Sequence, residues 1–259
     1  MTRAAALGAI AFAVLVPAAP AQAVEAAVRA RPAIRLEMLA ERVAKLNAQV
    51  GQGVLGGRSR RSLEEAIRDF DETLGPVMES APGAEARDTY RVLTLLWVQY
   101  RALALKPANR DTARKFRDRT DELAFIAAKG ARLVQESARA SSNASAVRAE
   151  NAAVLAQRVA KIHLWMQWGM RDEVLARSLR ESSENLPRIL ATLRESPANT
   201  PEISEELAGA EGQLRFLEDA ARDLAQRKSE ARAIEFIAKA ADHILDSMER
   251  VAGLYERAP

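Results

Sequence analysis

Residues Met38–Val54 read MLAERVAKLNAQVGQGV, and residues Val154–Met170 read VLAQRVAKIHLWMQWGM. Both stretches contain Leu-Ala-x-Arg-Val-Ala-Lys followed eight residues later by glycine, and they begin 116 positions apart. The same offset relates two further pairs of short matches, Arg61–Leu63 with Arg177–Leu179 and Glu79–Ser80 with Glu195–Ser196. Because every match keeps this offset, the pattern indicates a tandem duplication of one helical unit.

The composition of the chain favours helices throughout. Of its 259 residues, 48% are hydrophobic, 28% are charged and only 5% are aromatic. Alanine, leucine, arginine and glutamate dominate, as they do in long amphipathic helices. The alternating β-branched and aromatic residues of strands are almost absent. The sequence therefore predicts an all-α fold, with enough residues for one large domain or two of ordinary size.

The beginning of the chain has the pattern of a secretory signal peptide. Arg3 provides a positive charge, Ala4–Val16 form an apolar segment, and prolines precede an Ala-x-Ala cleavage site that ends at Ala23. The alternative is an uncleaved membrane anchor, but the apolar segment is short for a bilayer span and prolines follow it. We expect cleavage after Ala23 and a mature protein located in the periplasm.

The charge and the cysteine count exclude some kinds of site and partner. The chain has no cysteine, which excludes disulfide bonds and thiolate metal sites. Its formal net charge is only +3, and basic and acidic residues alternate along the expected helices. No dense basic segment with interleaved aromatic residues is present, so we expect no nucleic-acid partner.

The repeat predicts two structural units, residues 24–140 and residues 141–259, after the signal peptide at residues 1–23. Each unit is expected to form an antiparallel four-helix bundle with short loops. No proline occurs between Pro107 and Pro187, so the last helix of the first unit is expected to continue into the second. Ser141–Ser145 is the weak point of this connection, because serine and asparagine compete for backbone hydrogen bonds. A long shared helix would stack the bundles end to end; a true break is the alternative.

Helical periodicity predicts which side chains face the core. The apolar faces are Ile34, Met38, Leu39, Val43 and Leu46 in the first helix, Leu63, Ile67, Phe70, Leu74 and Val77 in the second, and Val92, Leu95, Leu96 and Tyr100 in the third. In the last helix they are Ile234, Ile237, Ile244, Leu245, Met248 and Leu254. Pro32 is expected in the first turn of its helix, and Pro187 is expected to kink or split the helix that contains it.

Signatures of catalysis are absent from the sequence. Its two histidines, His163 and His243, have no partner at metal-ligand spacing, and no glycine-rich phosphate loop or serine elbow occurs. We expect His163 to lie near a helix interface, and Asp242 and His243 to lie at the surface. Trp165 and Trp168 are expected to pack in or near the core, with a ligand pocket as the alternative. The sequence therefore predicts a protein that is not an enzyme, with no cofactor and no metal.

Arg42 and Arg158 occupy matching positions in the two copies, and each is followed one turn later by a lysine, Lys45 or Lys161. A guanidinium group at a helix interface requires a carboxylate partner or an anionic ligand, because an unpaired buried charge is costly. Two hypotheses remain open for these arginines. They form internal ion pairs that fix the helix register, or they line an anion site between helices.

These residues resemble the N-terminal sensor domain of type IV pili methyl-accepting chemotaxis transducers, the PilJ-type domain. The first helix of that family typically reads Gly-Arg-Gln-Arg-Met-Leu-Ser-Gln-Arg-x-Ala-Lys, and Arg35–Lys45 is similar to it, as is the second copy ending Leu155–Lys161. The closing segment Ala240–Glu256 is also similar to the last helix of the family. The resemblance covers essentially the whole mature chain.

The PilJ-type domain is similar in turn to the periplasmic helical domains of nitrate/nitrite sensor kinases, in which a first-helix arginine receives the anion. Arg35 matches the first arginine of the motif, but Glu37 replaces the second, and the second copy has Asn151 and Ala153 at these places. A negative charge at Glu37 would oppose anion binding by Coulomb repulsion. The transmembrane and signalling regions of the family are missing, so we expect a stand-alone exported protein.

Together these observations predict a periplasmic sensor-like protein in a signalling, chemotaxis or type IV pilus context. It would bind a small ligand, with an anion as one class, or a partner protein such as a membrane receptor or a pilus component. Arg35, Arg42 and Arg158 are the candidate ligand-binding residues. Related sensor bundles dimerise through their first and last helices, so a homodimer is one expected assembly. The alternative is a structural or interaction protein without a small-molecule ligand, whose arginines are satisfied internally.

Overall fold

The computed structural model describes residues 20–106, 108–137, 143–226 and 230–257, so most of the predicted signal peptide lies outside the described residues. Within these ranges every regular element is an α-helix and no strand occurs, which confirms the all-α fold class. The described helices are α1 (Pro20–Gln52), α2 (Gly57–Glu79), α3 (Gly83–Ala104), α4 (Arg110–Ser137), α5 (Ala144–Gln167), α6 (Glu173–Arg194), α7 (Pro201–Ala225) and α8 (Glu230–Arg257). None of them is both long and apolar enough to cross a membrane.

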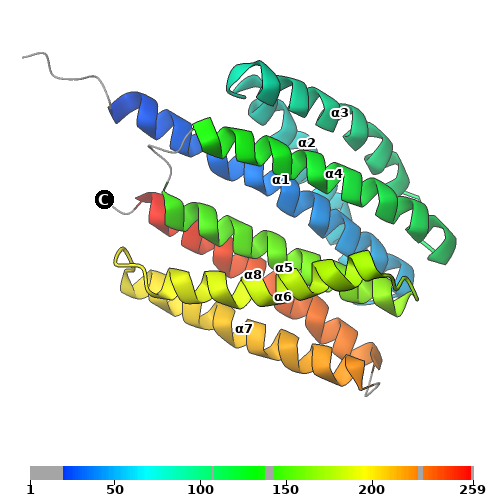
Figure 1. The fold of residues 1–259 in the computed structure, drawn as a ribbon. Coiled ribbons are helices and arrows are strands. Elements are labelled where there is room, and N and C mark those ends of the chain that lie inside the picture. Colours follow the sequence, from blue (N-terminus) through cyan, green and yellow to red (C-terminus); the bar gives the residue numbers. More distant parts are fainter. Residues whose placement is uncertain (1–19, 107, 138–142, 227–229, 258–259) are drawn as a thin grey trace, which may run out of the picture.

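Two helices from different halves of the chain, α1 and α5, lie side by side at the centre of the molecule (Figure 1). α1 also packs against α2 and α4, and α5 also packs against α6 and α8. The other two helices lie on the outside, α3 mainly on α4 and α7 mainly on α8. Since α2 and α3 touch each other little, and α6 and α7 also touch little, each outer helix is held mainly by one neighbour.

α1 and α5 run in the same direction and end in the same way (Figure 1). The repeated glycines that follow them, Gly53 and Gly169, have positive φ angles of 70° and 83°. In both places the next amide donates to the carbonyl five residues before it, Val54 to Gln49 at 2.9 Å and Met170 to Trp165 at 3.1 Å. This is the Schellman pattern, in which glycine adopts the left-handed conformation that closes a helix. The repeated glycine therefore has the same structural role in both places.

The expected end-to-end stack through one long helix is wrong. α4 ends at Ser137, and α5 begins after Asn143, whose side chain accepts hydrogen bonds from the first amides of α5. α4 and α5 run antiparallel (Figure 1), and ion pairs connect the first part of α4 with the end of α5 and the turn after it, Asp121 with Lys161 and Arg117 with Asp172. The predicted weak point at Ser141–Ser145 falls partly outside the described residues. The two halves therefore pack laterally.

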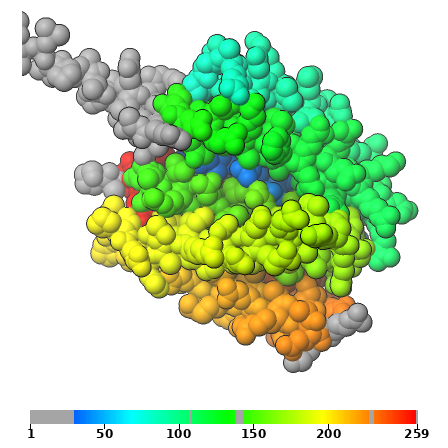
Figure 2. Space-filling view, in the orientation of Figure 1, coloured from blue at the N-terminus to red at the C-terminus, as the bar shows by residue number. Residues whose placement is uncertain are grey.

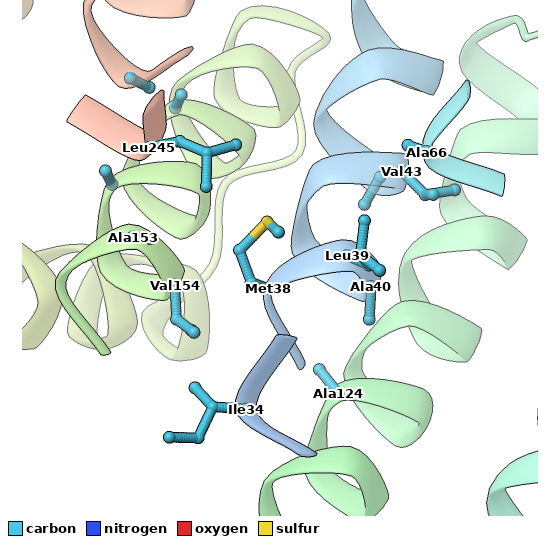
Figure 3. Packing of buried hydrophobic residues seen from close by; sticks show 14 of the residues in the cluster. Ile34, Met38, Leu39, Ala40, Val43, Ala66, Ala124, Ala153, Val154 and Leu245 are labelled. Atoms are coloured by element: carbon cyan, nitrogen blue, oxygen red, sulfur yellow. The ribbon is translucent and has the colours of Figure 1, made fainter. Parts of the chain in front are cut away.

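Lateral packing follows from the burial of α1 on nearly every side. Its predicted apolar face is buried as expected, but so are residues on its other faces, among them Leu36, Ala40, Ala44 and Ala48. Met38 lies on the side that faces α5 and α8, whereas Leu39 and Val43 face α2 and α4 (Figure 3). In the space-filling view, α1 is visible only in a small area between the surrounding helices (Figure 2). One continuous apolar core therefore includes residues of both halves.

Pro32 lies inside α1 rather than in its first turn as expected, and Pro187 lies inside α6, which it does not split. α1 begins at Pro20, and α6 runs unbroken from Glu173 to Arg194. A proline inside a helix removes one backbone hydrogen bond and crowds the preceding turn. In α6 the buried Leu186 and Leu190 lie on both sides of Pro187. Packing of this face against the core therefore outweighs the lost hydrogen bond.

The predicted buried face of α3 is wrong at Val92 and Leu95, whereas Tyr100 is buried and Leu96 is partly buried against the core. Val92 and Leu95 are 44% and 69% exposed. The large side chains buried instead are Tyr90, Leu93, Trp97 and Tyr100. Because α3 has apolar residues on both of these faces, periodicity alone does not choose between them. The observed face buries three aromatic rings, which remove more apolar surface from water than the aliphatic side chains of the other face.

Gly130 in α4 is expected to tolerate no larger side chain. A Cβ atom there would lie 2.8 Å from the ring of Tyr90, whereas a Cβ atom at Gly209 in α7 would meet nothing within 4 Å. Gly130→Ala should therefore lower the free energy of unfolding by about 1–3 kcal/mol through overpacking. Gly209→Ala is the matched control and should raise it by up to about 1 kcal/mol, because alanine favours helix. Urea denaturation followed by circular dichroism measures both, and equal effects would contradict the close contact of α3 with α4.

Candidate functional site

The predicted site arginines lie on the two central helices, where charged side chains of α1 and α5 meet. Glu41 of α1 is 1% exposed, and its carboxylate accepts a hydrogen bond from Arg158 Nε at 2.8 Å and lies 2.7 Å from Lys161 Nζ. Glu37, one turn earlier on α1, accepts from Arg158 Nη2 at 2.7 Å. Arg158 thus bridges two carboxylates of the neighbouring helix. This contact fixes the register of α5 along α1.

The charges in this cluster are balanced. The charge of Glu41 raises the pKa of Arg158 above its ordinary value, against the opposing effect of burial. Burial by itself would raise the pKa of Glu41, but Lys161 and Arg158 hold it below its ordinary value. At Glu37 burial is stronger than the attraction of Arg158, so the pKa of Glu37 is raised. Glu41 therefore serves as the internal anion of the cluster.

The two repeated lysines reach across to the last helix of the opposite half. Lys45 of α1 is fully buried and pairs with Asp242 of α8, and Lys161 of α5 lies 3.9 Å from Asp121 of α4. Asp242 is partly buried in this contact, with its side chain 30% exposed, and His243 beside it is exposed as expected. Burial lowers the pKa of Lys45, although Asp242 opposes this change. The two pairs connect the halves of the chain in matching ways.

Arg42 is the candidate arginine without an acidic partner. The offset of 116 maps Glu37 and Glu41 onto Ala153 and Gln157, so α5 offers Arg42 no carboxylate in return. Among the described residues Arg42 makes no hydrogen bond or ion pair, and its Nε atom is buried without an acceptor. The two matching arginines therefore have opposite environments, because Arg158 pairs with two carboxylates and Arg42 pairs with none.

Two buried amides add unpaired polar atoms to the same helices. Gln157 donates to the Ala241 carbonyl at 2.9 Å and to Asp242 at 3.4 Å, but its Oε1 atom is buried without a donor. Gln49 is fully buried, and neither of its amide atoms has a partner in the described structure. Gln49 follows Arg42 by two turns, so both lie on one face of α1. Buried polar atoms without partners are rare, and their presence marks this region as a candidate polar site.

Arg35 is paired on both sides. It donates to Glu249 of α8 and lies 3.4 Å from Asp69 of α2. Arg35 and Arg42 are two turns apart and share one face of α1, whereas Arg158 belongs to the cluster on α5. The three candidate arginines thus have separate surroundings and no partner in common.

Arg158 also lines a shallow cavity of about 400 Å³ beside α5 and α6, together with Arg148 and Arg188. Both of these arginines are exposed, and Glu37 contributes its carboxylate to the same cavity. Because Glu37 and Glu41 already neutralise Arg158, an added anion would compete with them. This cavity is therefore a weaker anion site than the surroundings of Arg42.

The acidic partners of these cations cannot be identified from helical periodicity alone. They are Glu37, Glu41, Asp121, Asp242 and Glu249. One signal for them is the difference between the copies, since the first has Glu41 where the second has Gln157. A charged residue in only one of two matching helices indicates a contact that the copies do not share.

His163 of α5 lines two neighbouring cavities between α5, α6 and α7, of about 450 Å³ and about 350 Å³. No hydrogen bond to His163 is found among the described residues. Burial lowers the pKa of His163 to about 4, so its ring is neutral at pH 7. Charged residues around the two cavities are Arg171, Glu218, Arg222 and Glu230.

The two tryptophans of α5 and its end pack against other residues. Trp165 is 1% exposed, and Lys161 Nζ lies 4.4 Å from the centre of its ring. Trp168 is partly buried against the core and lies close to Gly51. Both positions fit the expected core packing.

Within the described ranges, no group of three or more His, Asp or Glu side chains is arranged to hold a metal ion. Comparison of the chain with protein-family models, curated proteins and solved structures finds no match. The functional interpretation is therefore based on the arrangement of the buried charges.

Removing the charge of Glu41 should destabilise the protein strongly. Glu41→Gln would leave Arg158 and Lys161 buried with fewer acceptors, and breaking a buried ion pair costs about 3–5 kcal/mol. Glu184→Gln is the matched control, because Glu184 and Arg188 form an exposed pair within α6 that contributes about 0–1 kcal/mol. Urea denaturation compares the two variants. Similar losses in both would show that Glu41 does not hold α1 against α5.

Stability should also fall between about pH 7.5 and about pH 5.5 because of His163. The pKa of His163 is about 4 in the folded protein against an ordinary 6.5, so in this interval the unfolded chain binds a proton that the folded chain does not. Stability is therefore greatest above pH 6.5 and decreases as the pH falls, by at most about 1.4 kcal/mol per pH unit.

Urea denaturation at the two pH values measures this dependence. His163→Gln should reduce it, whereas His243→Gln, at the exposed histidine, should leave it unchanged. If both variants lose as much stability between the two pH values as the unchanged protein does, His163 is not the cause of the pH dependence.

Proposed function

We propose that this protein is a periplasmic, non-enzymatic, sensor-like protein that binds a small anion at Arg42. The observation that supports the proposal is the contrast between two matching arginines. Arg158 contacts two carboxylates, whereas Arg42 has no acidic partner among the described residues and its Nε atom is buried. A guanidinium group in these surroundings favours a planar anion, which accepts parallel hydrogen bonds from its fork. Nitrate, nitrite and small carboxylates have this shape.

The proposed architecture is a tandem pair of four-helix units, residues 24–140 and 141–259, which associate along α1 and α5. The matching helix ends at Gly53 and Gly169 support this division. In each half, consecutive helices pack against each other and the fourth packs against the first. Export through a signal peptide at residues 1–23 belongs to the same proposal and rests on the sequence pattern.

The resemblance to PilJ-type sensor domains supports a sensing role. Related sensor bundles are expected to dimerise through their first and last helices, and here the first helices of the two proposed units pack in parallel within one chain. An anion at Arg42 would change the charge balance along α1, which contacts α5 through Glu41 and α8 through Lys45. A small shift of α1 against these helices would be the signal. A membrane receptor or a pilus component would detect it.

The second candidate is a structural or interaction protein without a small ligand. The observation that favours it is the internal pairing of two of the three candidate arginines, Arg158 with Glu37 and Glu41 and Arg35 with Glu249. The exposed apolar side chains of α3 and its C-cap would then contact the partner protein, and they are Val92, Leu95, Val98 and Leu105.

A thermal-shift experiment separates the two candidates. Nitrate, nitrite, formate and acetate are compared with chloride at constant ionic strength, so that screening stays the same. An anion at one hundred times its dissociation constant should stabilise the fold by about 2.7 kcal/mol. Arg42→Gln should abolish this stabilisation, because it removes the guanidinium group that the anion contacts.

Arg188→Gln is the matched control, because it removes an exposed arginine from the shallow cavity beside Arg158. It should keep the anion-dependent stabilisation. An anion effect that persists in Arg42→Gln and disappears in Arg188→Gln would place the site in the other cavity. Absence of any anion effect would favour the interaction protein, whose partner is then sought by pull-down from periplasmic extract.

A further inference from the structure

A stack of aromatic rings fills the interior of the first half of the chain. The rings belong to α2, α3 and α4, and their centroids are 3.8, 5.8 and 4.5 Å apart in the order Phe70, Trp97, Tyr100 and Phe116. All four side chains are buried. The stack therefore occupies the space between α2, α3 and α4, next to α1, where the Tyr100 hydroxyl donates to the Ala40 carbonyl.

The matching positions of the second half carry smaller side chains. The offset of 116 relates Phe70 to Leu186, as it relates the buried Leu74 to the buried Leu190. Between α3 and α7 the buried positions match at an offset of 117, which maps Tyr90, Leu93, Trp97 and Tyr100 onto Leu207, Ala210, Leu214 and Leu217. Four aromatic positions of the first half thus correspond to leucines, and no stacked rings are found among the described residues of the second half.

The cavity of about 350 Å³ lies where these rings are missing. Leu186, Leu214 and Leu217 all line it, and they are the counterparts of Phe70, Trp97 and Tyr100. A further lining residue, Ser183, matches the buried Ile67 of the first half. The first half also has a cavity between α2 and α3, of about 480 Å³, which is lined by Trp97 but by neither Phe70 nor Tyr100. The smaller side chains of the second half therefore let its cavity reach the counterparts of these two rings, Leu186 and Leu217.

One polar side chain faces this apolar space from α5. His163 lines the cavity and matches Asn47, whose amide donates to the Ala104 carbonyl at 3.2 Å in the first half. His163 itself has no hydrogen-bond partner within the described structure. His163 is partly exposed, and a neutral imidazole has one donor and one acceptor nitrogen with which a ligand can bond. The cavity thus combines an apolar wall with the imidazole of His163 and with three exposed polar side chains at its opening, Ser183, Glu218 and Arg222.

We propose that this cavity binds a small aromatic molecule with one hydrogen-bonding group, of the indole or phenol class. The ring would take the place that Trp97 and Tyr100 occupy in the first half, and its polar group would bond to His163. An apolar cavity left by missing side chains takes up aromatic molecules of suitable size, and largely apolar pockets with few polar groups are typical of small-molecule sites. The site includes neither Arg42 nor its neighbours, so it is independent of the proposed anion site.

Access to the cavity is along the line where α6 and α7 touch little. Glu218 and Arg222 of α7 line the cavity and are exposed, so the cavity reaches the surface beside them. The second cavity, of about 450 Å³, adjoins it at His163 and Ala221. A molecule larger than a single ring system would extend into this neighbouring space.

Isothermal titration calorimetry of the full chain with indole tests the proposal. Leu214→Trp gives the second half the side chain found at the matching position of the first, so it should fill the cavity and weaken indole binding by at least about tenfold. Leu95→Trp is the matched control, because it adds the same ring at an exposed position of α3 and should leave binding unchanged. Indole that binds Leu214→Trp as tightly as the unchanged protein overturns the assignment.

A second variant tests the polar contact. His163→Phe removes the hydrogen-bonding nitrogens and should weaken indole binding more than binding of toluene, which has no hydrogen-bonding group. Equal losses for both probes would overturn the role of His163, and no heat with either probe at its solubility limit would overturn the proposal.

Nuclear magnetic resonance of the two histidine rings tests the proposal on the unchanged protein, so it does not depend on whether a variant folds. Indole should shift the imidazole signals of His163, which lines the cavity, and leave those of the exposed His243 in place. Signals of both rings that remain unchanged at saturating indole would contradict the proposal, whatever the behaviour of the variants.

Discussion

A carboxylate buried between two parallel helices has to be neutralised, and the arrangement of the molecule depends on how Glu41 meets this requirement. Arg158 and Lys161 supply the positive charges from α5, and a shift of one turn in either direction would separate them from the acid. Lys45 repeats the arrangement toward α8. These contacts align the two halves, and the apolar side chains around α1 and α5 then bury them in one core.

The same need to neutralise a charge between the central helices makes Arg42 the candidate ligand-binding residue. Arg158 pairs with Glu37 and Glu41 of α1. The counterparts of these two acids in α5 are Ala153 and Gln157, so α5 provides no carboxylate for Arg42. Arg42 is partly buried, and its Nε atom has no acceptor. Because burying such a group without a partner is costly, a chain that used its arginines only to fix helix register would gain from a second carboxylate. The proposed anion would supply that charge reversibly, which is what distinguishes a sensor from a scaffold.

Much of this fold could be predicted from helical periodicity, and the exceptions have physical reasons. The buried face of α2 follows from apolar spacing, since it presents one clear stripe, whereas α1 is buried beyond its predicted face. Asn109 accepts hydrogen bonds from the first turn of α4 as a cap should. The face of α3 could not be chosen because two apolar faces compete. Lateral rather than end-to-end packing could not be derived either, because periodicity shows that a face is buried but not which helix covers it. For that reason Arg158 could be proposed as a site residue while its partners Glu37 and Glu41 could not.

The parallel pairing of α1 and α5 within one polypeptide has a consequence for how the two halves can change. In an assembly of two identical subunits, each substitution appears twice, so an emptied interior or an unpaired cation would arise on both sides together and its cost would double. Here the first half has the aromatic stack and the unpaired Arg42, whereas the second half has leucines in place of three of the rings and the paired Arg158. Covalent linkage thus permits a division of labour that identical subunits cannot evolve.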